Sequence, residues 1–277
     1  MWLCHFQILT DYRENTAMMR SLYTAATGMI AQQTHLDVIA HNLANVNTTG
    51  FKKNRAEFED LIYQTHKFAG TETIGGQQIP VGVQIGLGTK VNSTAKIHTQ
   101  GDYNKTDSPL DMAIEGEGYF RVLRNGETYY TRDGSWKLNS DGVIVSQDGN
   151  PLDPEFVVPE DAVHLEVDSA GFMAAIDQRG NIVAEGRIEL SRFINPPGLF
   201  SMGYNLYQPT EASGPAIDGN PGEEGFGTIA HGFLEMSNVE VVSEMVNMIV
   251  AQRAYEMNSQ AITTSDEMLS IANNLKR

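Results

Sequence analysis

The chain has 277 residues, with 19 Lys and Arg against 35 Asp and Glu, and carries a formal net charge of −16 at pH 7. This acidic balance argues against a nucleic-acid-binding protein, because such proteins need a basic surface to contact phosphates. The single cysteine, Cys4, excludes an intrachain disulfide, a CxxC redox pair and a cysteine-based zinc site. No apolar run approaches the roughly 18 residues that cross a bilayer, so we expect no membrane insertion.

Residues 1–18 stand apart from the rest of the chain. They contain some apolar residues but neither a basic segment nor a small-residue cleavage site, so they do not fit a secretory signal peptide. The regular pattern begins only after Met18 and Met19. We treat 1–18 as a leader, either a functional extension or the product of an over-extended start site, and leave it out of the fold prediction.

The first predicted element is an amphipathic helix from Arg20 to about residue 46. The stretch lacks proline and repeats its seam positions at alternating spacings of four and three residues. The turn formers of 45–50 follow, and Gly50 can adopt a positive φ, so we expect the helix to stop there. The predicted seam positions are Leu22, Ala26, Met29, Gln33, Leu36, Ala40 and Leu43.

The second predicted helix lies at the other end of the chain. Residues 238–277 contain neither Gly nor Pro, and Ser237 with Glu240 fits an S-x-x-E capping box, with Met236 and Val241 as a hydrophobic staple. A helix of about 38 residues would be about 57 Å long, which favours a partner along its length. The predicted seam positions are Val241, Met245, Met248, Gln252, Tyr255, Ser259, Ile262 and Leu269.

Residues 96–230 are predicted to form an all-β domain. Short alternating runs flank Asn125 and Gly126, a pattern typical of a β-hairpin, and further glycine turns follow at regular intervals. Residues 67–92 carry many Gly and Thr and little periodicity, so we expect an extended connector over 51–95, with a second one over 210–227. The predicted fold class is α+β: the terminal segments 19–50 and 236–277 pair as a coiled-coil-like domain beside the all-β middle domain.

The pattern alone leaves two uses of the terminal helices open. They could pack on the β-domain of their own chain, or they could associate between chains as coiled coils. Gln33 and Gln252 occupy seam positions and either fix the register between helices or face solvent or a channel. Arg253 flanks the seam, where we expect an interhelical ion pair or a carbonyl contact.

A search for chemistry predicts no catalytic residue, no metal ligand and no cofactor. There is no G-x-S-x-G motif, the histidines do not form H-E-x-x-H, and the glycines of 82–90 depart from a phosphate-binding loop. Asp107, Asp111, Glu115 and Glu117 would suit a glycosidase acting on a cell wall, but on a chain this acidic a solvated face is the better interpretation. An adhesin or other binding module is a second alternative.

Several segments carry a family resemblance. Residues 21–33 and 41–52, which include Asn42 and Asn45, resemble the N-terminal signature of flagellar rod and hook proteins. Residues 236–256 with Asn258 resemble the C-terminal signature of the same family. Residues 58–64 and 130–134 resemble the distal-rod members, with the proximal-rod members as the nearest alternative.

The resemblance implies a non-enzymatic subunit of the bacterial flagellar basal-body rod. Such a subunit assembles with copies of itself into a helical tube through its terminal helices, with the β-domain outside and 51–95 stiffening the rod, and transmits torque from motor to hook. The implied partners are neighbouring rod and hook proteins, rod bushing rings and the flagellar type III export apparatus. The implied location is the basal body, as an exported, periplasmic or cell-wall-spanning protein. We also expect both ends to gain order on assembly, because a lone heptad helix leaves an apolar stripe in water.

Overall fold

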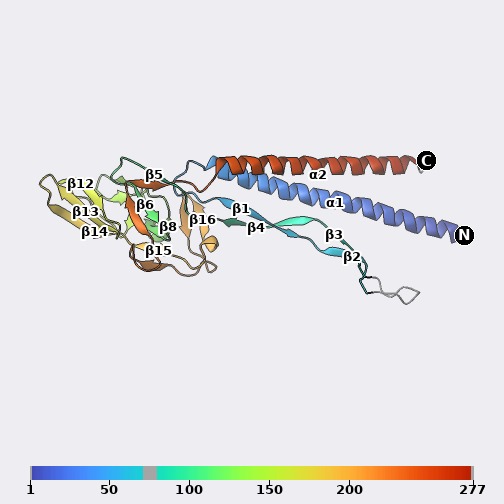
Figure 1. The fold of residues 1–277 in the computed structure, drawn as a ribbon, viewed down its shortest axis with the longest axis horizontal. Helices are drawn as coiled ribbons and strands as arrows, with labels where there is room; N and C mark the ends of the chain where they lie inside the picture. Colours follow the sequence, from blue (N-terminus) through green and yellow to red (C-terminus); the bar gives the residue numbers. More distant parts are fainter. Residues whose placement is uncertain (1, 71–79, 276–277) are drawn as a thin grey trace. The chain divides into compact units, whose positions relative to one another are not determined.

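The computed structural model describes residues 2–70 and 80–275, and the side chains of 20–70, 80–272 and 274. The chain divides into two compact units. Unit 1 contains the described residues of 1–41, 54–95 and 242–277, and unit 2 contains 42–53 and 96–241. Two long helices, α1 (Trp2–Ala44) and α2 (Val241–Leu275), accompany many β-strands (Figure 1), so the protein is of the α+β class.

Helix α1 includes most of the segment that the prediction left out, because it begins at Trp2. It ends at Ala44, and the chain then turns through residues 45–50. Gly50 adopts a φ of 66°, in the left-handed region that favours glycine. The predicted stop at the turn cluster is therefore confirmed.

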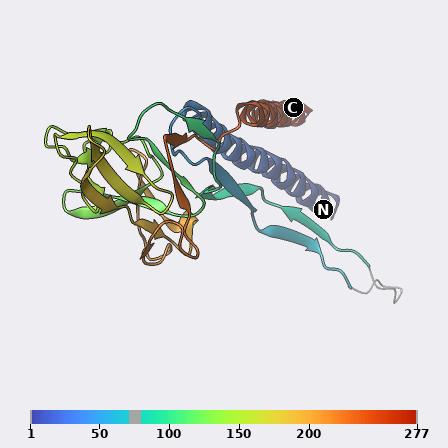
Figure 2. The same ribbon diagram turned by 60° about the vertical axis from the view of Figure 1, so that its left-hand side comes forward.

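The predicted connector of 51–95 contains four strands. β1 (Asn54–Asp60) pairs with β4 (Thr89–Lys96), and β2 (Tyr63–Lys67) pairs antiparallel with β3 (Val83–Gly86). Together they form a narrow two-stranded arm (Figure 2). The chain is extended here, as predicted, and its strands also pair with each other, which satisfies backbone groups of this stretch.

The arm contacts α1 within unit 1. Thr27 Oγ1 accepts a hydrogen bond of 3.4 Å from the Thr89 amide, and Arg20 donates one of 2.9 Å to Gln64 Oε1. The ring of His35 meets that of Phe58 edge-on at 5.7 Å between centroids. These contacts tie the strand pairs to the first helix along its length.

Unit 2 is built on antiparallel strands. Its largest sheet has seven strands in the order β16-β17-β8-β7-β15-β18, with β11 also paired to β7. A three-stranded meander, β12-β13-β14, and the pairs β19-β6, β20-β5 and β10-β9 complete it. The strand bounds are β5 (Tyr103–Lys105), β6 (Met112–Glu115), β7 (Tyr119–Arg124), β8 (Glu127–Thr131), β9 (Lys137–Leu138), β10 (Ile144–Val145), β11 (Leu152–Asp153), β12 (Ala162–Val167), β13 (Phe172–Asp177), β14 (Ile182–Arg187), β15 (Leu190–Arg192), β16 (Phe200–Gly203), β17 (Leu206–Gln208), β18 (Ile217–Gly219), β19 (Thr228–His231) and β20 (Phe233–Glu235), and a short 3-10 helix spans Pro196–Gly198.

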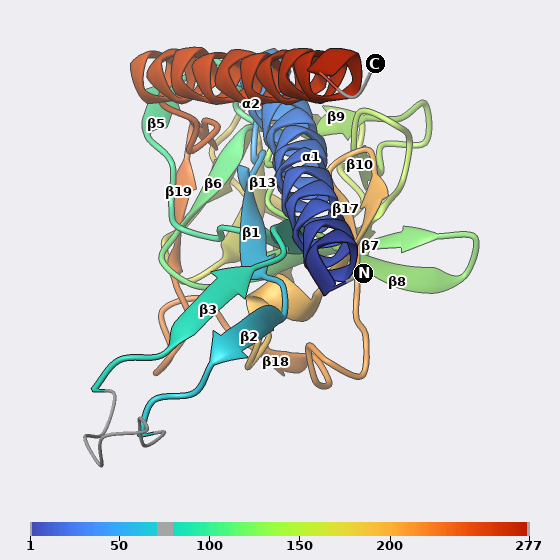
Figure 3. The ribbon, with the colours of Figure 1, turned by 90° about the vertical axis from the view of Figure 1, so that its right-hand side faces the viewer.

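The predicted hairpin at Asn125 and Gly126 joins β7 and β8 (Figure 3). Both turn residues have positive φ, 54° and 84°, as a two-residue hairpin turn requires. The main hydrophobic core of unit 2 includes Trp136 and Phe120, whose rings meet edge-on at 5.5 Å between centroids. A second, smaller core is aromatic and centres on Tyr119, Tyr130 and Phe193.

Unit 2 reaches beyond the predicted limits of 96–230 on both sides. Residues 42–53 belong to it, of which the prediction assigned 42–50 to the helical domain and 51–53 to the connector, and so do β20 and the rest of the chain up to 241. The segment 210–227, predicted as a connector, contributes β18 to the large sheet. The two stretches that lead to the helices are thus part of the β-unit.

Gly50 provides a test of this arrangement. A Cβ at residue 50 would lie 2.6 Å from the backbone carbon of Arg132, whereas Gly126, at φ 84°, has open space around it. We expect Gly126→Ala to cost about 1 kcal/mol of stability and Gly50→Ala at least about 2 kcal/mol more, because only the latter adds a backbone clash to the left-handed strain. Urea denaturation of the full chain measures both, and equal costs would contradict the seating of the turn.

Candidate assembly surface and helix junction

The structure separates the predicted seam of α2 into two groups. Met248, Ser259, Ile262 and Leu269 are half-buried, whereas Val241, Met245, Gln252 and Tyr255 are exposed. The most buried positions of this helix include Ala251 and Ser265, which the prediction did not select. The predicted seam therefore lies along the edge of the covered face.

The predicted seam of α1 shows the same offset. Its apolar members are at most half-buried, and Gln33 and Ala40 are exposed. The buried side chains lie to one side of the predicted row, at Ala25, Ala31, Ile39 and Asn42. The half-buried members of the prediction are Leu22, Ala26, Met29, Leu36, Leu43 and Asn45.

Small and polar residues explain the offset. A Cβ at Gly28 would lie 2.9 Å from Asn258 Nδ2, and the hydroxyl oxygens of Ser21 and Ser265 are 3.3 Å apart. Here α1 and α2 approach each other through small and polar residues, which a prediction based on large apolar side chains does not select. The recurrence of Ala25, Gly28 and Ala31 at three-residue steps was the sequence signal for this face.

The opposite face of α2 is apolar and exposed. Six large apolar side chains on its N-terminal half are between 52% and 69% exposed. At 3.6 residues per turn they fall on one side of the helix, opposite Ala251 and Ser265. We call this set the α2 apolar stripe: Val242, Met245, Val246, Ile249, Val250 and Met257.

The start of α2 corrects the predicted cap. The helix begins at Val241, so Ser237 lies outside it, and its hydroxyl instead accepts a 3.3 Å bond from the Val239 amide. Asn238 holds this segment in a non-helical path. Its Oδ1 accepts from the Lys53 amide at 2.8 Å, and its Nδ2 donates to the carbonyls of Ile97 and Thr99 at 2.9 and 3.0 Å. Asn238 therefore bonds to other segments of unit 2, and α2 begins three residues later than the S-x-x-E pattern of Ser237 and Glu240 predicts.

The turn after α1 is anchored in the same part of unit 2. The Gly50 amide donates to the Glu235 carbonyl at 2.8 Å, and the Thr49 hydroxyl donates to Asp133 Oδ1 at 2.8 Å. Asn205 Nδ2 donates to the Thr49 carbonyl at 3.1 Å. The stretch that leaves α1 and the stretch that enters α2 are therefore fixed side by side, and we call this region the helix junction (48–53, 97–101 and 235–238).

His98 is part of the junction and remains neutral. Its Nδ1 is 2.8 Å from the Tyr119 hydroxyl, and its ring meets that of Tyr207 edge-on. Burial, followed by the charges of Lys52, Lys96 and Arg132, lowers the pKa of His98 to about 3. Burial also raises the pKa of Tyr119 to about 12, so both partners stay uncharged at neutral pH.

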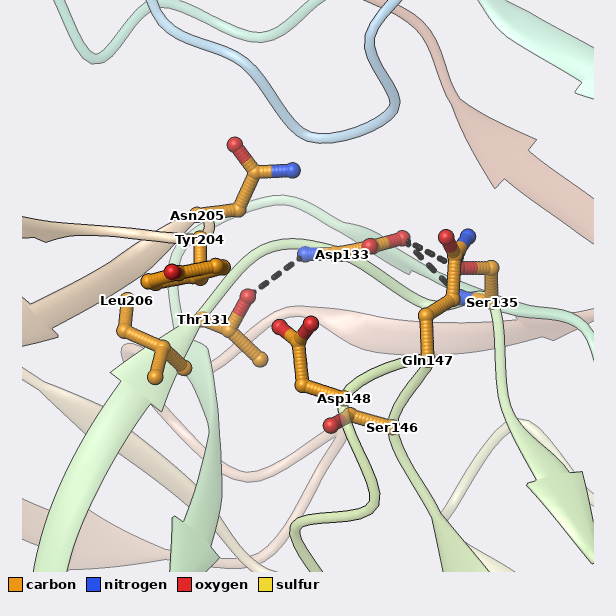
Figure 4. Close-up of a pocket in the computed structure, with 9 residues that line it drawn as sticks. All are labelled: Thr131, Asp133, Ser135, Ser146, Gln147, Asp148, Tyr204, Asn205 and Leu206. Carbon is orange, nitrogen blue, oxygen red and sulfur yellow. Dashed lines mark hydrogen bonds between the residues drawn. The ribbon is translucent and has the colours of Figure 1, made fainter. Parts of the chain in front are cut away.

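A polar pocket of about 200 Å³ lies next to the junction turn (Figure 4). The carboxylate of Asp133 faces into this region but is engaged, since Oδ1 accepts from Thr49 and from both the amide and hydroxyl of Ser135. Those bonds give it a structural role in holding the turn. None of the four carboxylates considered for a glycosidase lines this pocket; its lining residues are Thr131, Asp133, Ser135, Ser146, Gln147, Asp148, Tyr204, Asn205 and Leu206.

The remaining predicted features are placed as follows. Arg253 pairs with Glu256 on its own helix at 2.8 Å, instead of with the other helix. Within the described residues, no three acidic, histidine or cysteine side chains gather as metal ligands would. Across the same part of the chain, no helix has both the length and the apolar character needed to cross a membrane.

Asn238 and Ser237 allow a direct comparison. We expect Asn238→Ala to lower the stability of the full chain by about 1–3 kcal/mol, because it leaves the Lys53 amide and the junction carbonyls without their partner. Ser237→Ala should cost under about 1 kcal/mol, because its hydroxyl makes one local bond. Urea titration measures both, and a larger cost at Ser237 would restore the capping-box interpretation.

His98 predicts a pH effect of defined sign. Since the folded pKa lies below the usual value, the unfolded chain binds the extra proton, and stability falls as pH drops from about 6.5 towards 3. The slope from this one residue is at most about 1.4 kcal/mol per pH unit. His98→Gln should flatten the fall in stability between pH 7 and 5 relative to the unmodified protein, and parallel curves would show that His98 does not contribute.

Comparison with known proteins gives three family matches along the chain. Residues 22–52 match the family described as flagella basal body rod protein, and 113–175 match the flagellar hook protein FlgE/F/G D1 domain. Residues 230–275 match the flagellar basal body rod FlgEFG protein C-terminal family. These segments include the junction turn, part of the large sheet, and α2.

Whole-length relatives agree with these matches. The chain is 52% identical over 264 residues to the flagellar basal-body rod protein FlgG of Borreliella burgdorferi, covering 94% of this chain and 100% of that protein. It is 46% identical to FlgG of Buchnera aphidicola subsp. Schizaphis graminum, covering 91% and 98%, and 45% identical to FlgG of Caulobacter vibrioides, covering 93% and 100%. The chain belongs to the family of flagellar basal-body rod proteins and is of its distal-rod type.

Proposed function

We propose that this structural subunit of the flagellar distal rod assembles with copies of itself into a helical tube, through its two terminal helices, and that the tube transmits torque from motor to hook. The observation that carries the proposal is the α2 apolar stripe. Its six side chains lie on one face of a long helix, and the small-residue contact with α1 uses the opposite face. A second copy would supply the apolar partner that this face lacks within the described chain.

The stripe has a sufficient driving force for association. Completing the burial of a half-exposed Val, Ile or Met contributes on the order of 1 kcal/mol. The free energy of burial adds up over the side chains of the stripe and over the contacts that each subunit makes in a polymer. The sum favours assembly at modest protein concentration. The exposed seam residue Val241, one turn before Met245, extends the same surface.

We further propose that α1 and α2 pair as a coiled-coil-like rod core. The approach of Gly28 to Asn258 and of Ser21 to Ser265 supports this pairing. In that arrangement 19–50 and 236–277 form the inner part, 51–95 connects and stiffens, and 96–230 lies outside. Gln33 and Gln252, exposed in the single chain, then either set the register between copies or face the channel.

The proposed partners follow from the family. A rod subunit contacts neighbouring rod and hook proteins, and bushing rings where these are present, and lies in the basal body across the periplasm and cell wall. Export through the flagellar type III apparatus is part of the same proposal. We also propose that both helical ends gain order on assembly, because the stripe is covered only then.

An enzymatic role has no support from the site. The relatives are named as rod proteins, and the chain is a structural subunit. Among the carboxylates considered for wall hydrolysis, Glu117 pairs with Arg192 at 3.8 Å and Glu115 accepts from the Thr228 hydroxyl. These are the contacts of surface residues in a β-unit.

Charge placed in the stripe tests the assembly surface. We expect Val246→Glu to leave the stability of the monomer within about 0.5 kcal/mol, because the side chain is already exposed, and to reduce tube formation at least about tenfold. Val163→Glu is the matched control, since Val163 is 50% exposed and Val246 is 53% exposed. Light scattering and electron microscopy of the full chain provide the measurement, and unchanged tubes from Val246→Glu would refute the proposed surface.

A further inference from the structure

Three charged side chains meet inside unit 2 at the helix junction. Lys52 Nζ lies 2.5 Å from Glu235 Oε1, and Arg132 Nη1 lies 3.4 Å from Glu235 Oε2. The three residues are 0%, 1% and 6% exposed for Lys52, Glu235 and Arg132. Complete burial of three charges in one place is rare, because each loses its hydration.

Backbone groups bond to several other polar atoms of the cluster, although the buried Arg132 Nε has no hydrogen-bond partner among the described residues. Lys52 Nζ also donates to the Thr99 carbonyl at 2.8 Å, and Glu235 Oε1 accepts from the Gly101 amide at 3.1 Å. Arg132 Nη2 donates to the Gly116 carbonyl at 2.8 Å, and its guanidinium lies 5.1 Å from the centre of the Tyr119 ring. The cluster thus joins β20 to the chain after α1 and to two loops of the β-unit.

The charges of the cluster do not cancel. Two cations share one carboxylate, so the cluster carries one excess positive charge. Burial lowers the pKa of Lys52; Glu235 opposes that shift and Arg132 adds to it. Three apolar side chains of similar size would stabilise such a site as well or better, so stability alone does not explain these residues.

Their position in the chain points to a different role. Lys52 follows the turn that leaves α1, and Glu235 ends the strand that leads into α2. These residues are 183 positions apart. A buried charge must find its own partner, so a shifted alignment of the two stretches would leave charges unpaired, whereas apolar residues would tolerate the shift.

We propose that Lys52, Glu235 and Arg132 form a charge lock that fixes the stretch leaving α1 against the stretch entering α2 in one register, and so positions both terminal helices for assembly. The first half concerns unit 2 of the single chain. The second half rests on the proposed function.

The lock is tested by native-state hydrogen exchange on the full-length monomer. The variants are Lys52→Met, Glu235→Gln and the double change. The control is Glu59→Gln, which removes the acid of the exposed Lys90–Glu59 pair. We expect Glu235→Gln to accelerate exchange at least about tenfold in the peptides covering 48–53 and 97–101, and much less in β7, β8 and β13. Glu59→Gln should leave both regions unchanged.

The order of effects distinguishes a charge lock from ordinary packing. Glu235→Gln keeps the size of the side chain but leaves two buried cations without a counter-charge, whereas Lys52→Met leaves the Arg132–Glu235 pair intact. The isosteric change should therefore be the more disruptive one, and adding Lys52→Met to it should restore part of the protection. Additive effects, a silent Glu235→Gln, or loss of protection spread evenly over unit 2 would each overturn the lock.

Lys52→Met keeps the test decisive if Glu235→Gln fails to fold. It should loosen 48–53 locally in a monomer whose β-unit keeps its protection, and an unchanged 48–53 would reject the lock. Tube formation by the same variant tests the second half, where we expect a loss of at least about tenfold. Normal tubes from a loosened Lys52→Met chain would overturn the positioning role, whereas an unmodified chain that forms no tubes would refute the proposed function and leave the lock to the exchange result.

Discussion

The fold depends on one crossing, at which the chain leaving α1 meets the chain entering α2. The Gly50 amide bonds to the Glu235 carbonyl, Asn238 bridges Lys53 to residues 97 and 99, and the Lys52–Glu235 pair lies buried beneath. Each bond joins segments that are far apart in sequence, so forming the crossing requires the β-unit between them to be folded. Within unit 2, the chain after α1 and the chain before α2 are thus fixed to each other and to the β-strands.

The crossing also explains why particular residue types occur at its centre. Gly50 is needed because the turn passes over the backbone of Arg132 and Asp133 with no room for a Cβ. Asp133, which lines the pocket of Figure 4, accepts hydrogen bonds from the hydroxyls of Thr49 and Ser135 and so fixes the turn after α1. His98 is kept neutral beside three cationic side chains. Packing and hydrogen bonding therefore restrict the residue types at these few positions.

Sequence reasoning succeeded where the determining interactions are local. The stop after α1, the Asn125–Gly126 hairpin and the α+β class all follow from turn chemistry and periodicity. It failed where contacts between distant segments determine the local structure. Helix α2 begins three residues later than the pattern at Ser237 predicts, because Asn238 bonds to other segments of unit 2. The strands of 51–95 were not predicted because β1 finds its partner in β4, beyond an intervening hairpin.

In both helices the predicted seam lies beside the buried face. The prediction followed the large apolar side chains, and these are not the ones that are buried. In a protein that functions alone, those side chains would face inward. Here the inward face of α2 carries Ala251 and Ser265, and the outward face carries Val246 and Ile249. The large apolar side chains of α2 thus lie on its exposed face, where they form a surface available for association. Under the proposed function, copies of the same subunit cover that face, so the pattern that would be an error in a protein that functions alone serves assembly here.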